Sequence, residues 1–216
     1  MNNPLSYIMI KKNAINKNGI DMIIDYMKRS DNIEKAKVFD SEASNAQKKT
    51  IFKYTKEIRD VELVGVSDLI KSHMNEYFNY LSEEIINPFY GVEVDEYVGV
   101  NYCKYDVGGH YLSHCDSEQV MNLKNGKDIW KKVLDRDLSI VLYLNDDFEG
   151  GELFFSDYNI KVKPEAGLLL TFPSTHKYMH SVEPVTKGTR YAMVCWATIK
   201  GFITVSDQDK LIQQLL

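Results

Sequence analysis

The segment 110-HYLSHCDSEQ-119 carries a histidine and an aspartate two positions apart, on either side of a cysteine. Successive side chains of a strand point to opposite faces, so in an extended backbone His114 and Asp116 share one face while Cys115 points away. An imidazole and a carboxylate on one face make half of a metal site that contains no sulfur. The third ligand must come from elsewhere in the chain.

The next histidines along the chain are His176 and His180, within 173-PSTHKYMHSVEPV-185. Either imidazole would complete a set of two histidines and one carboxylate. Such a set occupies one face of an octahedron, leaves three positions open and is typical of non-haem Fe(II) oxygen chemistry. The open positions matter because a co-substrate must chelate the metal and O2 must bind beside it.

Two further side chains could hold an anionic co-substrate. Arg190 lies ten residues after His180, on a strand predicted to return after a turn. Arginine is always charged and offers a planar fork to a carboxylate. The strand predicted over 136–143 presents Ser139, Val141 and Tyr143 on one face, so the Tyr143 hydroxyl could donate a hydrogen bond toward the same anion.

Short β-rich runs must position these residues. From Val92 onward such runs follow one another, each bounded by Gly, Pro, Asn or Asp, which is typical of a sandwich or jelly roll. They are VGVNYCKY, DLSIVLYLN, ELFF, IKVK, GLLLTF, YMHSVEPV and RYAMVCWATI.

Two apolar-periodic segments before these runs predict helices. The first covers about 18–29, and the second begins with Ser67 as N-cap and ends at Pro88. The apolar stripe expected on the second helix consists of Leu69, Ile70, Met74, Tyr77, Leu81 and Ile85.

The polar segment 117–136 interrupts the strands and is long for a connection. Two interpretations stay open: a lid or binding loop, and a surface insertion that carries a short helix. Trp130 within it is expected to anchor the segment locally rather than to contact a substrate.

Length and composition predict one soluble domain of 216 residues, with 44% hydrophobic and 26% charged residues. The net charge of −5 argues against a large phosphate-binding face, so nucleic acid is not the expected partner. No apolar run reaches the length of a membrane span, and no secretory signal is visible. Three scattered cysteines without CxxC spacing indicate reduced thiols, so we expect a cytoplasmic protein.

Three pieces of the chain, in this order, resemble the prolyl-4-hydroxylase-like Fe(II)- and 2-oxoglutarate-dependent dioxygenases. They are 105-YDVGGHYLSHCD-116, 136-RDLSIVLYLNDDFEGGELFF-155 and 164-PEAGLLLTFPSTHKYMHSVEPVTKGTRYAMVCW-196, and they cover roughly the C-terminal half. The resemblance implies an α+β, β-rich fold with a double-stranded β-helix (jelly-roll) core supported by N-terminal helices. We expect a single dioxygenase domain over 1–216, with N-terminal helical and strand support in 1–90, the catalytic core in 91–200 and a C-terminal tail in 201–216.

The resemblance also assigns roles to residues. It makes His114, Asp116 and His180 the catalytic iron ligands. It pairs Arg190 with the distal carboxylate of 2-oxoglutarate, assisted by Tyr143, with Tyr105 lining the same pocket. The implied cofactors are Fe(II) and the co-substrate 2-oxoglutarate, with ascorbate as a further candidate. The 149-EGGE-152 element resembles the family's hairpin, with a structural role.

The implied reaction inserts one oxygen atom of O2 into a substrate C–H bond and releases succinate and CO2. The leading substrate is a prolyl residue in a protein or peptide, and a free amino acid or another side chain is the alternative. Collagen-type enzymes carry lysine where this chain has Arg190, which places the chain closer to the bacterial, viral and oxygen-sensing branches.

One rival hypothesis is a zinc hydrolase built on 110-HYLSH-114 and 176-HKYMH-180, whose i, i+4 spacing would put histidines on one helix face. Pro173 and Pro184 flank the second pair, and no HExxH glutamate is present, which argues against helices there. His110 and His176 are instead expected to be polar residues of loops or of the pocket edge.

Two further rivals concern what the fold is used for. Nucleic-acid dealkylation belongs to a related branch that typically has a second arginine six residues after the first, where this chain has Trp196. A jelly-roll binding module without catalysis would not need the complete set of His114, Asp116, His180 and Arg190.

Overall fold

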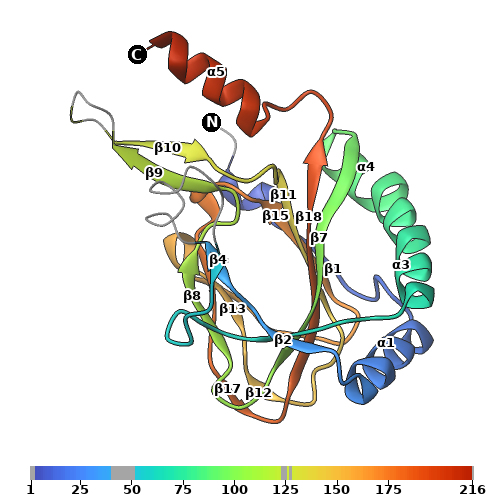
Figure 1. The fold of residues 1–216 in the computed structure, drawn as a ribbon. Coiled ribbons are helices and arrows are strands. Elements are labelled where there is room, and N and C mark those ends of the chain that lie inside the picture. Colours follow the sequence, from blue (N-terminus) through green and yellow to red (C-terminus); the bar gives the residue numbers. More distant parts are fainter. Residues whose placement is uncertain (1–2, 40–51, 123–125, 127, 216) are drawn as a thin grey trace.

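Two antiparallel sheets face one another in the structure, a computed structural model that describes residues 3–39, 52–122, 126 and 128–215 (Figure 1). In spatial order the larger sheet consists of β1 (Met9–Lys11), β15 (Leu169–Pro173), β11 (Leu138–Tyr143), β18 (Arg190–Ile199), β7 (Val94–Tyr105), β6 (Glu62–Val64) and β2 (Ile33–Lys35). The smaller sheet consists of β14 (Ile160–Val162), β13 (Leu153–Phe155), β16 (His180–Val182), β8 (His110–His114) and β5 (Arg59–Asp60). This architecture confirms the predicted β-rich jelly roll.

Shorter elements connect the strands. Two-stranded pairs are formed by β3 (Val38–Phe39) with β4 (Phe52–Lys53), β9 (Glu118–Asn122) with β10 (Asp128–Lys132), and β12 (Glu149–Gly150) with β17 (Val185–Lys187). Single 3-10 turns cover Pro4–Tyr7, Ser156–Tyr158 and His176–Tyr178. No helix in the described part of the chain is both long and apolar enough to cross a membrane.

Helices α1 (Lys17–Arg29) and α3 (Asp68–Leu81) lie along the outer face of the larger sheet (Figure 1). The Asn16 side chain accepts a hydrogen bond from the Gly19 amide, and the Ser67 side chain accepts one from the Ile70 amide. Both helices therefore begin with a satisfied N-cap, and the predicted start at Ser67 is confirmed.

The prediction that Pro88 ends the second helix is wrong. A π-helical turn, Ser82–Ile86, follows α3, and the helical turn α4 (Asn87–Tyr90) carries Pro88 at its second position, so the helical backbone continues past the proline. The chain leaves the helix at Gly91, whose φ of 66° and N–H bond to the Asn87 carbonyl form a left-handed cap.

The predicted apolar stripe of α3 is partly wrong. Leu69 is 65% exposed, whereas Phe78 is buried. The side chains that face the sheet follow Ile70 at steps of four, four and three residues, through Met74 and Phe78 to Leu81, which matches the helical repeat better than a stripe starting at Leu69.

Strand β11 separates two apolar cores because its side chains alternate between two buried faces. Ile140 and Leu142 pack with the buried residues of α1 and α3. Val141 and Tyr143 pack between the two sheets, in a cluster that includes Phe155. The sequence prediction that Val141 and Tyr143 share a face is therefore confirmed.

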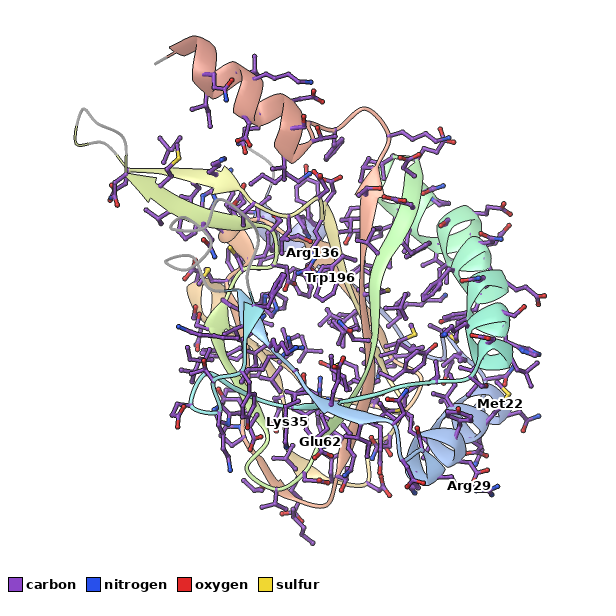
Figure 2. All side chains as sticks on the ribbon, viewed as in Figure 1. Met22, Arg29, Lys35, Glu62, Arg136 and Trp196 are labelled. Atoms are coloured by element: carbon purple, nitrogen blue, oxygen red, sulfur yellow. The ribbon has the colours of Figure 1, made fainter. Side chains whose placement is uncertain are left out.

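Strands from the first 64 residues join both sheets. β1 pairs with β15 at one edge of the larger sheet, and β6 pairs with β7 toward the other edge. β5 pairs with β8 in the smaller sheet, opposite Tyr111 and His110. An ion pair between Lys35 Nζ and Glu62 Oε1, 3.2 Å apart, joins β2 to β6 (Figure 2). The N-terminal segment therefore reaches the strand that carries His114.

The segment 117–136 contains the hairpin of β9 and β10, which pair antiparallel with Trp130 opposite Val120. The described residues of this segment, 117–122, 126 and 128–136, form no helix, in contrast to the alternative of a short helix. The hairpin projects from the end of the molecule, and α5 (Val205–Leu215) lies over it (Figure 1).

Gly150 is held where alanine does not fit. Its φ is 76°, and a Cβ atom there would lie 2.3 Å from the Pro184 carbonyl oxygen. We expect Gly150→Ala to lower the free energy of unfolding by about 2 kcal/mol, from the left-handed backbone and the clash together. The matched control is Gly91→Ala, with a φ of 66° but no atom within 4 Å of its Cβ, and an expected cost of about 1 kcal/mol. Equal urea midpoints for the two variants would contradict this account of Gly150.

Candidate active site

The structure brings His114, Asp116 and His180 together at the end of the smaller sheet. His114 ends β8, His180 begins β16, and the two residues are direct partners in the strand register. One ligand atom from each of the three residues lies within 4.8 Å of the others. The Nε2 atoms of His114 and His180 are each 3.6 Å from an oxygen of Asp116. His176, the other histidine left open by the sequence, is not in this group.

Backbone carbonyls orient both imidazoles. Nδ1 of His114 lies 2.8 Å from the Leu112 carbonyl oxygen, and Nδ1 of His180 lies 3.0 Å from the Tyr178 carbonyl oxygen. Because a carbonyl only accepts, each Nδ1 donates its proton there, and Nε2 is the ring atom that remains to bind a metal. Burial lowers the pKa of His114 to about 3, so this ring is neutral, which is the form that binds a metal.

Asp116 accepts a hydrogen bond from Ser139, a residue that the sequence places on the same strand face as Tyr143 but to which no role was assigned. The Ser139 hydroxyl donates to Oδ2 of Asp116 at 2.6 Å, and Ser174 lies 2.8 Å from Ser139. Burial alone would raise the pKa of Asp116, but His180, His114 and the Ser139 hydroxyl lower it to about 2. The carboxylate is therefore ionised and oriented for coordination. Ser139 lies four positions before Tyr143 on β11 and therefore shares its face, which is the sequence signal that points to Ser139.

Cys115 lies outside the ligand group, as expected, but not in the core. It is half-buried, and its thiol donates to the Glu118 carbonyl at 2.9 Å, whereas Cys103 and Cys195 are buried. The helical arrangement that a zinc hydrolase would need is absent from the described residues 110–114, which form strand β8. His110 is not among the residues that line the cavity; its ring nitrogens contact the Gly108 carbonyl at 2.8 Å and the Glu57 carbonyl at 3.2 Å.

Arg190 is buried beside two aromatic rings. It begins β18 opposite Tyr105, and its guanidinium carbon lies 4.4 Å from the centroid of the Tyr105 ring and 5.1 Å from that of Tyr143. Only 1% of Arg190 is exposed. Gly151 makes room for it, because a Cβ there would lie 3.0 Å from the Arg190 side chain.

Three buried donors of this group have no hydrogen-bond partner within the described part of the chain: Nε and Nη1 of Arg190 and the Tyr143 hydroxyl. Burial raises the pKa of Tyr143, so its hydroxyl keeps the proton that it would donate. Buried polar groups are normally paired. A carboxylate is the ligand that would satisfy a guanidinium and a phenol at once.

One cavity of about 510 Å³ connects the histidine–aspartate group with Arg190 and Tyr105. Its volume lies within the usual range for small-molecule sites. Apolar side chains from the core between the sheets line part of it, including Val141 and Leu153.

Two arginines that the sequence analysis did not assign also line this cavity. Arg59 on β5 lies 4.8 Å from the centroid of the Tyr111 ring, which stacks on His114 at 3.5 Å. Arg136 lies 3.4 Å from the centroid of the Trp196 ring (Figure 2). Nothing near Arg59 in the sequence indicates this position, since it depends on the pairing of β5 with β8.

These residues fit the groups that the resemblance implies. Two imidazoles and a carboxylate, with their ligand atoms within 4.8 Å of one another, suit Fe(II). The unpartnered donors of Arg190 and Tyr143 suit the distal carboxylate of 2-oxoglutarate.

Comparison with known sequences finds proteins that are similar to part of this chain. Residues 100–198 match the family model of the 2OG-Fe(II) oxygenase superfamily. A PKHD-type hydroxylase from Aliarcobacter butzleri is 33% identical over 137 residues, which are 60% of this chain and 52% of that protein. Prolyl 3-hydroxylase 2 from Homo sapiens is 44% identical over 69 residues, 30% of this chain and 10% of that protein. The chain thus spans about half of the first relative and a tenth of the second.

Comparison with solved structures shows the same fold. A prolyl hydroxylase from Trichoplax adhaerens, solved in complex with a hypoxia inducible factor oxygen degradation domain peptide fragment, superposes with a TM-score of 0.61. The alignment covers 89% of this chain and 84% of that one, at 16% sequence identity. The jelly-roll architecture therefore extends well beyond the segment that matches by sequence.

Proposed function

We propose that this protein, whose residues 100–198 match the family model of the 2OG-Fe(II) oxygenase superfamily, is an Fe(II)- and 2-oxoglutarate-dependent dioxygenase of the prolyl-hydroxylase-like type. The observation that carries the proposal is the cavity shared by the His114, Asp116 and His180 group and the unpartnered donors of Arg190. Strands from the first 64 residues pair in both sheets, which supports a single dioxygenase domain over 1–216.

Each residue has a distinct task in this proposal. His114, Asp116 and His180 would hold Fe(II), and Arg190 with Tyr143 would bind the distal carboxylate of 2-oxoglutarate. When bound, these groups supply the oxidation that puts one oxygen atom of O2 into a C–H bond and the other into succinate, with release of CO2. The protein contributes placement: the carbonyl-bound imidazoles and the Ser139-bound carboxylate fix the ligands before a metal arrives.

A prolyl residue in a protein or peptide is the proposed substrate. The named relatives and the solved neighbour, which are prolyl or PKHD-type hydroxylases, support it. We keep the cytoplasm as the proposed compartment because the three cysteines are free, and ascorbate as a candidate cofactor for assays.

A free amino acid or another carboxylate-bearing substrate is the second candidate. Arg59 and Arg136 line the cavity, and neither forms an ion pair with a described residue. Two guanidinium groups beside the iron ligands favour a substrate that presents a negative charge. Nucleic-acid dealkylation has no such support, because the position of its second arginine holds Trp196 with Arg136 stacked on it.

The test is an anaerobic titration of the apoprotein with Fe(II) and 2-oxoglutarate, followed by succinate release in air against a panel. The panel contains proline-bearing peptides, free proline and other amino acids. We expect a visible metal-to-ligand charge-transfer band, and succinate release stimulated by the peptides. Stimulation by free amino acids alone would favour the second candidate. A folded protein that forms no band would refute the dioxygenase proposal.

A further inference from the structure

Hairpin β9–β10 forms one rim of the cavity. Glu118 and Gln119 at its start and Val133 and Leu134 just after its end line the cavity. The two strands pair with each other and with neither large sheet. No strand pairing joins the described residues of the hairpin to either large sheet, so other contacts must fix the position of this rim.

One set of contacts fixes the hairpin to the segment that precedes the ligand His180. A Glu118 carboxylate oxygen accepts hydrogen bonds from the His176 amide at 2.7 Å and from its ring Nδ1 at 2.6 Å. The Trp130 ring stacks flat on the His176 ring, with centroids 4.7 Å apart and an interplanar angle of 3°. Trp130 therefore ties β10 to the segment before His180, and that it does not contact a substrate stays a prediction.

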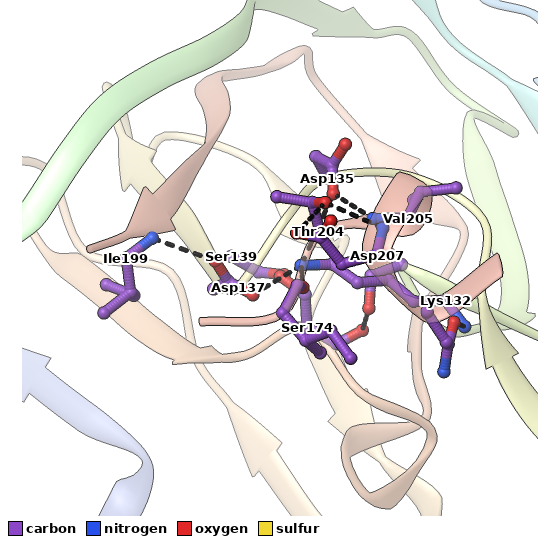
Figure 3. A network of polar contacts seen from close by, with 12 residues as sticks. Lys132, Asp135, Asp137, Ser139, Ser174, Ile199, Thr204, Val205 and Asp207 are labelled. Carbon is purple, nitrogen blue, oxygen red and sulfur yellow. Dashed lines mark hydrogen bonds and ion pairs between the residues drawn. The ribbon is translucent and has the colours of Figure 1, made fainter. Parts of the chain in front are cut away.

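A second set of contacts holds the C-terminal end of β10, and it centres on Lys132, the last residue of this strand. Lys132 is only 8% exposed, which is unusual for lysine. Its Nζ donates to Asp137 at 2.7 Å and to the Ile203 carbonyl at 3.0 Å (Figure 3). Asp137 in turn accepts from the Ile199 amide at the end of β18, so Lys132 links the hairpin to the larger sheet.

Helix α5 adds its own contacts to this linkage. The Gln208 side chain accepts from the Lys132 amide at 2.9 Å. Asp209 pairs with Lys131 at 2.6 Å, and Asp135 accepts from the Val205 amide at the start of the helix (Figure 3). Two successive residues of β10 are therefore bound by two successive residues of α5.

We propose that α5 is a positioning element for the primary substrate, acting through Gln208 and Asp209 on the cavity rim. This proposal rests on the proposed function only in assuming that the cavity binds a substrate, because the attachment of α5 to the hairpin exists without iron. His114, His180 and Arg190 lie on β8, β16 and β18, and Asp116 follows β8; in the described part of the chain none of the four side chains bonds to α5. Loosening α5 should therefore disturb the rim and leave 2-oxoglutarate binding intact.

The test compares the double variant Gln208→Ala/Asp209→Asn with Gln213→Ala, a change at an exposed glutamine of the same helix. Hydrogen–deuterium exchange of the full chain should be about fivefold faster or more in the amides of β9 and β10 in the double variant, because a hydrogen bond and an ion pair are lost. The control should exchange like the natural chain. Unchanged exchange in the hairpin would overturn the attachment.

The second readout separates positioning from a structural role. With the most active peptide of the succinate panel, the double variant should show a KM raised about fivefold, while kcat and the 2-oxoglutarate Kd from the charge-transfer band stay unchanged. An equal loss in kcat, or an unchanged KM with a loosened hairpin, would overturn the positioning role. Failure of the dioxygenase proposal itself would show differently, as absence of the band in the natural chain.

Discussion

The His180→Ala variant is expected to show no charge-transfer band when Fe(II) and 2-oxoglutarate are added without oxygen. Its imidazole is one of three donors in the group and is already oriented by the Tyr178 carbonyl. Loss of a residue that only orients a ligand typically costs 10–100-fold in metal affinity, so loss of a ligand should cost more than about 100-fold. The measurement is a titration with Fe(II) at saturating 2-oxoglutarate, followed in the visible range.

The matched control for this variant is His176→Ala. His176 lies four residues before His180 and packs on Trp130 instead of joining the ligand group. We expect the band to persist in this variant. A band that survives in His180→Ala and disappears in His176→Ala would reverse the assignment of the third ligand.

Arg190→Ala is expected to weaken 2-oxoglutarate binding about tenfold to a hundredfold. The guanidinium is buried, and two of its donors have no partner within the described part of the chain. A hydrogen bond to a charged group contributes about 1.5–3 kcal/mol, which corresponds to that range in Kd. The same charge-transfer titration, now at saturating Fe(II) and varied 2-oxoglutarate, gives the Kd directly.

Arg136→Ala is the control that separates this role from a general effect of positive charge. Arg136 lines the same cavity but stacks on Trp196 and donates to the Asp116 carbonyl. Its loss should leave the 2-oxoglutarate Kd unchanged. If Arg190→Ala folds normally by circular dichroism and also keeps the Kd, Arg190 is not the carboxylate-binding residue.

Local alternation made much of the site predictable from the sequence. An extended HCD segment puts His114 and Asp116 on one face, and the run before Tyr143 puts Ser139 on the face that turns toward them. These inferences depend only on the period of a strand. The choice between His176 and His180 could not be made in this way, because it depends on the register of β16 against β8.

Features that depend on distant pairing could not be predicted. Arg59 reaches the cavity only because a two-residue strand pairs with β8, more than fifty positions later in the chain. The hairpin in 117–136 has a polar sequence without clear alternation, and its position depends on Lys132 and α5. The helix end predicted at Pro88 is wrong because the neighbouring residues alone do not show that helical backbone continues through α4.

The pairing of β1 with β15 has a consequence for how the protein is made. Met9 and Thr171, 162 positions apart, are register partners, and β5 likewise cannot pair before β8 has been synthesised. Long-range pairings of this kind fold slowly, because a large loop must close before they form. During synthesis the first strands emerge well before their partners, so their edges stay open to chaperones or to neighbouring chains. The proposed iron ligands, His114, Asp116 and His180, come together only after His180 has left the ribosome, so under the proposed function the metal would bind late in the folding of each molecule.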